Sequence, residues 1–267
     1  MPARTLSRLI IIAILAVTVI SCSPKNGPAQ PAMPTMLAPV EGSGQAGSIP
    51  TTGGLCDNIL FPVIQGASWM YYSTGGPNGD FAYSDTITEV GSNEFILTSQ
   101  FSNLTLSQKW MCSAEGLTAL QLGGGTAASV SMQNMILEFE ALEVKGLSLP
   151  REITSGMTWQ YDISLVGAVA MPGGENQSPG TFSLAMQEQG HESITIPAGT
   201  FDAVKMQATF NAQINADFQG SPVPYAVNGS SIIWYAPGVG YIKSIENIDF
   251  SGSTFTTTTE LQSYNIP

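Results

Sequence analysis

Residues 204–218 read VKMQATFNAQINADF, with an apolar residue at every even position and a polar residue at every odd position. Alternation with a period of two is typical of a β-strand that buries one face and exposes the other, as strands of antiparallel sheets do. The stretch spans 15 residues, which is long for a single strand. We therefore expect it to bend within a curved sheet.

Similar stretches on both sides of residues 204–218 predict an all-β fold. The strand candidates are residues 68–75, 81–90, 94–103, 105–113, 117–122, 135–145, 158–170, 181–188, 191–197, 232–236, 240–247 and 254–264. Turns rich in Gly and Pro separate them, such as Pro197–Gly199 and Pro237–Gly238, and loops are expected at 171–180 and 219–230. No window predicts a long amphipathic helix, although residues 127–143 could include a short one.

Two sequence motifs each occur twice. The segment GASWMY at 66–71 matches GMTWQY at 156–161, and WMCSAEG at 110–116 matches WYAPGVG at 234–240. These pairs predict an internal duplication with copies at about 61–122 and 149–264, the alternative being chance agreement. The pattern favours a curved antiparallel sheet, or half-open barrel, built from two duplicated β-meanders. A closed sandwich is the second expectation.

The first 21 residues are organised like a secretory signal peptide. Arg4 and Arg8 precede an apolar run from Leu9 to Ser21, which is shorter than the roughly 20 residues that a membrane-spanning helix needs. The run ends in VISC at 19–22, which resembles the lipobox of bacterial lipoproteins. The resemblance implies cleavage after residue 21 and lipidation of Cys22. The chain would then be lipid-anchored to a membrane of the bacterial cell envelope, outside the cytoplasm. An uncleaved signal anchor is the alternative.

Residues 22–55 are expected to form a disordered tether. Ser23–Leu55 contains six Pro, six Gly and no aromatic residue, so it buries too little apolar surface to offset the entropy of ordering. An ordered N-terminal arm is the alternative. The folded part is then one β domain at 56–267.

The charge balance excludes several partners. The formal net charge is −12, with 8 Lys and Arg against 20 Asp and Glu. Nucleic-acid binding and docking onto anionic lipid both need clustered Lys and Arg, so the membrane is expected to be reached through the lipid anchor alone. The single His, His191, argues against multi-His metal centres and is expected to be a surface or turn residue. We therefore predict no cofactor and no metal.

Cys56 and Cys112 remain after lipidation of Cys22. An even number of cysteines in an oxidising compartment predicts a disulfide between them. Two free buried thiols are the alternative.

Candidate catalytic groups are few. Glu138, Glu140 and Glu143 could form a metal or acid–base cluster, but Glu138 and Glu140 alternate with apolar residues, which favours a solvated strand face. We therefore name no catalytic residue.

The repeated motifs hold the aromatic residues that are most informative about binding. Because a Trp side chain buries 150–250 Å², these residues are expected to fill the core, the alternative being that they line a concavity for a ligand. The candidates are Trp69, Tyr71, Trp110, Trp159, Tyr161, Trp234 and Tyr235.

A wider resemblance rests on three segments: IPAGTFDAVK at 196–205, WYAPGVGYIK at 234–243 and the upstream GxxWxY pattern at 66–71 and 156–161. Together they resemble a group of exported bacterial β-rich proteins of unknown function. The resemblance implies a fold like the open half-barrels of periplasmic lipoprotein carriers. It implies no catalytic residue.

These observations predict a membrane-tethered lipoprotein with a non-enzymatic β domain that binds or carries an apolar ligand or an envelope partner. That hypothesis needs an interior pocket of about 300 Å³ or more. A structural envelope scaffold is the alternative. An envelope glycan hydrolase is less favoured, and it would need two carboxylates about 5–10 Å apart across a cleft.

Overall fold

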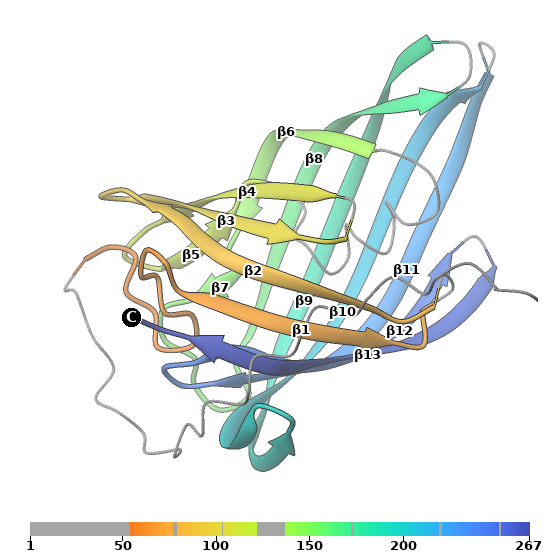
Figure 1. Ribbon diagram of the computed structural model, residues 1–267. Helices are drawn as coiled ribbons and strands as arrows, with labels where there is room; N and C mark the ends of the chain where they lie inside the picture. Colours follow the sequence, from red (N-terminus) through yellow and green to blue (C-terminus); the bar gives the residue numbers. More distant parts are fainter. Residues whose placement is uncertain are drawn as a thin grey trace, which may run out of the picture. The chain divides into compact units, whose positions relative to one another are not determined.

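A computed structural model describes residues 54–76, 79–102, 104–121, 137–171, 174–218, 221–250 and 252–267, which lie within one compact unit (Figure 1). These residues form strands and connecting turns, and none of them is helical. The strands are β1 (Ser68–Thr74), β2 (Phe81–Val90), β3 (Glu94–Gln100), β4 (Thr105–Cys112), β5 (Gly116–Ala119), β6 (Leu137–Gly146), β7 (Leu149–Pro150), β8 (Thr158–Met171), β9 (Gly174–Ile196), β10 (Gly199–Phe218), β11 (Ser221–Ala236), β12 (Gly240–Phe250) and β13 (Ser253–Asn265).

All thirteen strands join in one sheet, in the order β6-β8-β9-β10-β11-β12-β13-β1-β2-β3-β4-β5-β7, and every pair is antiparallel. The predicted all-β fold with one antiparallel sheet is therefore confirmed. A single continuous sheet is not the two-sheet sandwich that was the second expectation. The alternating stretch 204–218 lies in β10, where Met206 and Ala208 are buried.

Two predicted loops are wrong. The expected loop at 171–180 belongs to β9 from Gly174 onward, and the expected loop at 219–230 belongs to β11 from Ser221 onward. β10 extends to Phe218, and its backbone groups need partners on both sides. β11 supplies them up to Ser221, opposite Phe218, whereas β9 pairs with β10 only up to Gly180, opposite Ile214. Residues 174–179 of β9 pair with β8 instead, from Met171 back to Val166. β9 also joins the separately predicted strands 181–188 and 191–197 into one.

Residues 137–146 form β6, so this part of the stretch 127–143 is extended rather than helical. The rest of that stretch, residues 127–136, lies outside the described residues.

The two ends of the sheet approach each other around Leu147 and Ser148, which connect β6 to β7. Leu147 N donates to Gln160 O on β8, whereas Ser148 N donates to Leu117 O on β5. Ser148 Oγ accepts a further hydrogen bond from Ala119 N at 2.9 Å. The connection thus bridges the β8 side and the β5 side of the sheet, which closes the barrel partway as expected.

Residues Gly54–Gln65, here called the plug, pack against β1, β3 and β4. Phe61 stacks on Trp69, Phe95 and Trp110 with ring centroids 5.6–5.7 Å apart. The predicted disulfide joins Cys56 of the plug to Cys112 at the end of β4, with an S–S distance of 2.00 Å. The plug is therefore held by both a covalent bond and aromatic packing.

Main-chain contacts also fix the plug. Arg151 Nη2 donates to the carbonyl oxygens of Gly54 and Leu55, and Gly238 N in the β11–β12 turn donates to Ile59 O at 2.7 Å. The expected tether reaches residue 55, so its last two residues already contact the domain. Cys22, the signal peptide and the remainder of the tether lie outside the described residues.

The four tryptophans occupy matching places in the sheet. Trp69 and Trp159 are each the second residue of a strand, β1 and β8, whereas Trp110 and Trp234 are each third from the end of β4 and β11. This arrangement is what a duplicated meander would produce, and the duplication itself stays a prediction.

Candidate ligand-binding cavity

A cavity of about 250 Å³ lies inside the curved sheet. Its walls come from both halves of the sheet, because β1, β2, β4 and β5 contribute residues as well as β8, β9, β11, β12 and β13, and Phe61 of the plug covers part of it. The volume falls slightly short of the roughly 300 Å³ at which pockets for drug-sized molecules begin. The cavity therefore suits a small or chain-like group.

Much of the wall is apolar. Rings and aliphatic side chains of alternate residues along β9 point inward, namely Phe182, Leu184 and Met186. Phe81 of β2 and Ile233 of β11 line the same space. β2, β4, β9, β11 and β13 each contribute every second residue, as the pleat of a β-strand requires.

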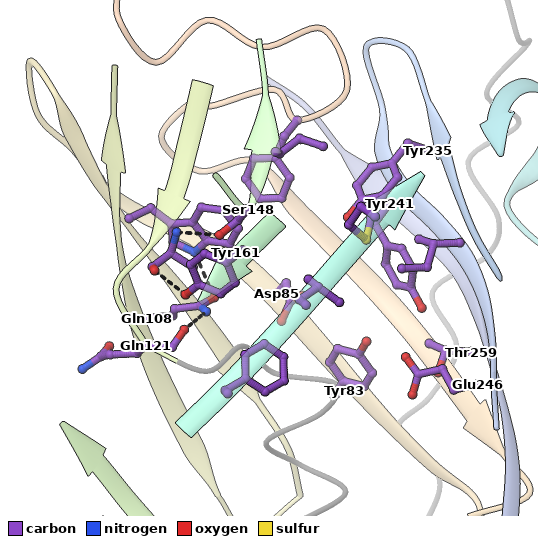
Figure 2. Close-up of a pocket in the computed structure, with 18 of the residues that line it drawn as sticks. Tyr83, Asp85, Gln108, Gln121, Ser148, Tyr161, Tyr235, Tyr241, Glu246 and Thr259 are labelled. Carbon is purple, nitrogen blue, oxygen red and sulfur yellow. Dashed lines mark hydrogen bonds between the residues drawn. The ribbon is translucent and has the colours of Figure 1, made fainter. Parts of the chain in front are cut away.

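One group of polar side chains in the wall is bonded internally. Trp110 Nε1 donates to Gln108 Oε1 at 2.9 Å, and Gln108 Nε2 donates to Gln121 O at 2.5 Å. Tyr161 donates its hydroxyl to Ala119 O at 2.5 Å. These groups, drawn with dashed lines in Figure 2, hold β4, β5 and β8 together. Their hydrogen bonds serve the closure of the sheet.

A second polar group consists of Tyr83 and Asp85 on β2 and Tyr241 and Glu246 on β12, here called the acid–tyrosine cluster. Figure 2 shows Glu246 beside Tyr83 and Tyr241, with Asp85 between this group and the bonded group around Gln108. Ser99 Oγ donates to Asp85 Oδ1 at 2.5 Å. The cluster therefore brings together side chains from strands that are distant in the sequence.

A β-bulge places Tyr241 in the cluster. Tyr235 pairs with Tyr241 and Trp234 pairs with Lys243, so Ile242 is an extra residue on β12. Such an insertion shifts the alternation of faces by one residue. As a result, Tyr241 and Ser244 face the interior together, and the Tyr241 hydroxyl donates to Ser244 Oγ at 2.7 Å.

Burial controls the protonation of both carboxyl groups. Desolvation raises the pKa of Asp85 from 3.8 to about 6, and the hydrogen bond from Ser99 opposes the rise. Burial also raises the pKa of Glu246, against hydrogen bonds from Thr257 and Ser244.

Burial likewise raises the phenol pKa of Tyr83 and Tyr241 well above 10, and the nearby Glu246 adds to both shifts. The phenols therefore remain neutral hydrogen-bond donors.

Asp85 and Glu246 were not among the predicted site residues. The signal was present, because Asp85 follows Phe81 and Tyr83 on the same face of β2, and Glu246 precedes Ile248 on the same face of β12. A carboxylate on the buried face of an alternating strand is the pattern that points to it.

Among the seven candidate aromatics, three line the cavity: Trp110, Tyr161 and Tyr235. Trp69 and Tyr71 are buried in the core, and Trp159 packs against that core. Trp69 Nε1 donates to Val239 O at 2.6 Å, and the Tyr71 hydroxyl donates to Tyr241 O at 3.0 Å. For Trp69, Tyr71 and Trp159 core packing is therefore the observed role.

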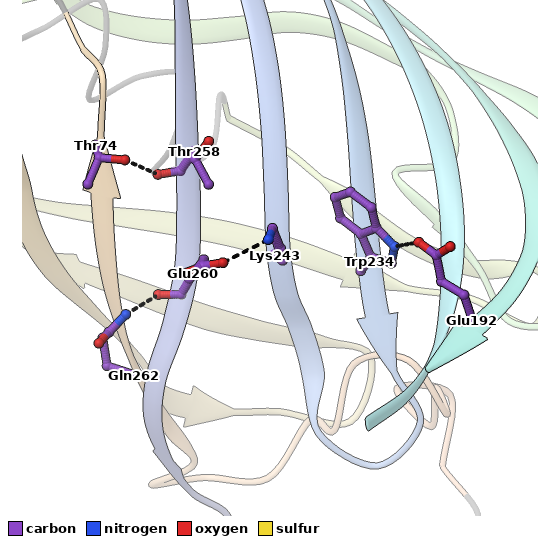
Figure 3. Close-up of polar contacts among 7 residues, drawn as sticks. All are labelled: Thr74, Glu192, Trp234, Lys243, Thr258, Glu260 and Gln262. Carbon is purple, nitrogen blue, oxygen red and sulfur yellow. Dashed lines mark hydrogen bonds and ion pairs between the residues drawn. The ribbon is translucent and has the colours of Figure 1, made fainter. Parts of the chain in front are cut away.

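Trp234 lies on the opposite face of β11 from its neighbours Ile233 and Tyr235, which line the cavity. Its Nε1 donates to Glu192 Oε1 at 2.5 Å (Figure 3), and Lys205 and Lys243 lie over its ring at 5.6 and 5.8 Å. Lys205 also pairs with Glu192 at 3.4 Å. Trp234 thus takes part in a polar network outside the cavity.

The other titratable candidates are not brought together. Glu143 is exposed and pairs with Lys145 at 3.1 Å, and His191 is exposed on β9. The side chains of Glu138 and Glu140 lie outside the described residues. Within the described ranges, no group of three His, Cys, Asp or Glu side chains could hold a metal ion. Nor do those ranges contain a helix long and apolar enough to cross a membrane.

By sequence, the chain matches one family model, and by fold it resembles several solved structures. A family model described as DUF3108-like matches residues 125–261. A protein of Bacteroides fragilis described as exported, with a YmcC-like fold, is 14% identical with a TM-score of 0.50 over 79% of this chain and 100% of that chain. At this identity the similarity shows the fold alone.

Two further structures match with lower TM-scores. A protein of Parabacteroides distasonis described as a lipoprotein is 16% identical, with a TM-score of 0.46 over 79% of this chain and 99% of that chain. The hypothetical lipoprotein YmcC of Escherichia coli is 12% identical, with a TM-score of 0.33 over 74% of this chain and 87% of that chain. No curated protein matches the chain significantly. The resemblance to exported β-rich proteins of unknown function is confirmed for family and fold. That these proteins share the three quoted segments stays a prediction.

Proposed function

Because the chain belongs to the DUF3108-like family and has the fold of a protein described as exported, we propose that it is a lipoprotein of the bacterial cell envelope whose β domain binds a small, mainly apolar ligand without catalysing a reaction. Lipidation of Cys22 would hold the domain at a membrane. The domain would then receive or present a ligand near that membrane.

The cavity is the observation that carries this proposal. A core built only for stability packs to the density of an organic crystal and leaves few voids larger than a water molecule. Here about 250 Å³ stays open between Phe81, Phe182, Leu184 and Ile233. Apolar walls with a few polar groups are the usual composition of a ligand site.

The carboxylates favour binding over hydrolysis. A glycoside hydrolase needs one carboxyl group with a raised pKa as the acid and one that stays ionised as nucleophile or base. Asp85 and Glu246 are the two carboxyl groups in the cavity wall, and burial raises the pKa of both. Because both pKa values are shifted in the same direction, the two environments do not distinguish an acid from an ionised nucleophile or base.

The test uses the exported chain with Cys22→Ser, which removes the lipidation site and leaves the domain intact. Native mass spectrometry of this protein, purified from a bacterial periplasm, should show a bound small molecule in addition to the protein mass. Solvent extraction of the same sample then identifies the class of the molecule.

Two tryptophan variants provide the control. Leu184→Trp should fill the cavity, because Leu184 lines it, and should abolish the bound mass. Met70→Trp changes an outer residue that is 49% exposed and should leave the bound mass unchanged. A ligand-free spectrum for both the parent Cys22→Ser protein and its Met70→Trp variant would contradict the proposal and favour the scaffold role. Cross-linking to envelope partners would then test that role.

A further inference from the structure

The charged residues that line the cavity are both acids. Asp85 comes from β2 and Glu246 from β12, and the lining residues include no Lys, Arg or His. The ion pairs between the described residues are Glu94–Lys109, Glu143–Lys145, Glu192–Lys205 and Glu260–Lys243. Neither cavity carboxylate belongs to any of them. Two carboxylates therefore face one interior space, with no basic side chain of the described chain in its wall.

Hydroxyl groups satisfy these carboxylates only in part. Ser99 bonds one oxygen of Asp85 at 2.5 Å. Ser244 and Thr257 approach Glu246 at 3.5 and 3.4 Å, near the upper limit for a hydrogen bond. A buried carboxylate is costly unless it is paired or fully hydrogen-bonded. The wall thus presents carboxylate oxygens that can still accept hydrogen bonds from a cationic ligand.

The surrounding side chains suit the same ligand. The phenol rings of Tyr83 and Tyr241 lie beside Glu246 (Figure 2), and the face of an aromatic ring attracts a cation. Phe81, Phe182 and Leu184 continue the wall with apolar surface. The wall therefore offers carboxylates and aromatic faces to a positive charge and apolar surface to a hydrocarbon chain.

We propose, on the basis of the ligand-binding function above, that the cavity selects an organic cation. Its protonated amine or ammonium group would lie in the part of the cavity that Asp85 and Glu246 line, and its apolar chain would lie along Phe81, Phe182 and Leu184. The ligand supplies the positive charge that the cavity wall lacks.

Three probes of equal chain length test the selection: decylamine, 1-decanol and decanoate. Each is titrated below its aggregation concentration into the full chain with Cys22→Ser at pH 7.5, and binding is measured by calorimetry. Decylamine should bind about tenfold or more tightly than decanol, because a charge-assisted hydrogen bond is added to the same apolar contact. Decanoate should bind most weakly. Equal affinities for decylamine and decanol, or tightest binding of decanoate, would overturn the inference.

Charge-neutral variants locate the effect. Asp85→Asn combined with Glu246→Gln keeps the shape of both side chains and should reduce the affinity for decylamine to that for decanol. Binding of decanol should not change, which also verifies that the variant is folded. Glu89→Gln combined with Glu152→Gln removes the same charge from two exposed residues and should preserve the preference for decylamine. Loss of the preference in this control pair would assign it to net charge and overturn the proposed site.

The same data separate this inference from the proposed function. If decanol binds and Leu184→Trp abolishes its binding, the cavity is a ligand site whatever the result with decylamine. If none of the three probes binds, both the ligand-binding function and the selection of a cation are contradicted.

Discussion

Ser99 Oγ on β3 donates a 2.5 Å hydrogen bond to Oδ1 of Asp85, the inward-facing carboxylate of β2. The bond links two adjacent strands, yet it does not offset the loss of hydration, since the pKa of Asp85 still rises to about 6. A buried acid with a raised pKa reduces the stability of the fold at neutral pH. Such a group is more typical of a functional site than of a core.

Asp85→Asn should therefore stabilise the protein at neutral pH. The folded state binds the Asp85 proton more tightly than the unfolded chain does, because the pKa rises from 3.8 to about 6. The stability contributed by this group is present below about pH 4 and is lost as the pH rises through about 6. Urea unfolding should show a gain of up to about 3 kcal/mol at pH 7.5. The gain should be nearly absent at pH 4, and an equal effect at both pH values would contradict the assignment.

The disulfide between Cys56 and Cys112 should dominate the attachment of the plug. The two cysteines are 56 residues apart, and closing a loop of this length stabilises a protein by about 4 kcal/mol in the chain-entropy model. Cys56→Ser with Cys112→Ser should lose about that much stability in urea unfolding, relative to Cys22→Ser alone. Hydrogen exchange should accelerate first in residues 54–65. Unchanged protection there would mean that the contacts of Arg151 and Gly238 hold the plug without the disulfide.

Much of the sheet was predictable because its strands alternate with a period of two. The predicted strand at 81–90 matches β2 at both ends, and the strand at 68–75 differs from β1 by one residue. The extensions of β9 and β11 were not predictable, since the first depends on pairing with the far end of β8 and the second on pairing with the far end of β10. Pairing between distant residues is a tertiary effect that local composition does not encode.

The site was less predictable than the fold. The motifs pointed to Trp110, Tyr161 and Tyr235, which line the cavity, but they also pointed to Trp234, which lies on the other face of the sheet. Asp85 was missed because its burial depends on strands that are distant in the sequence. The alternation places Asp85 on the same face as Tyr83, but whether that face surrounds a cavity depends on the neighbouring strands.

Closure of the barrel should depend on Gly146, where β6 ends. Gly146 has a φ of +78°, and a Cβ there would overlap the carbonyl oxygen of Gln160 on β8. Gly156 has a similar φ of +72° with no atom within 4 Å of the same position. Gly156→Ala should therefore cost only the conformational strain of about 1–2 kcal/mol. Gly146→Ala should cost clearly more in urea unfolding, and equal costs would show that the close approach to β8 does not matter.

Two tryptophans should report different events during binding, because Trp110 lines the cavity and Trp234 does not. Addition of decanol should change the intrinsic fluorescence, and Trp110→Phe should remove most of that change. Trp234→Phe should retain it, at a stability cost of about 1 kcal/mol for the lost bond to Glu192. Both variants keep an aromatic ring, so they form a matched pair. A fluorescence change that survives in Trp110→Phe and disappears in Trp234→Phe would place the ligand on the outer face of the sheet.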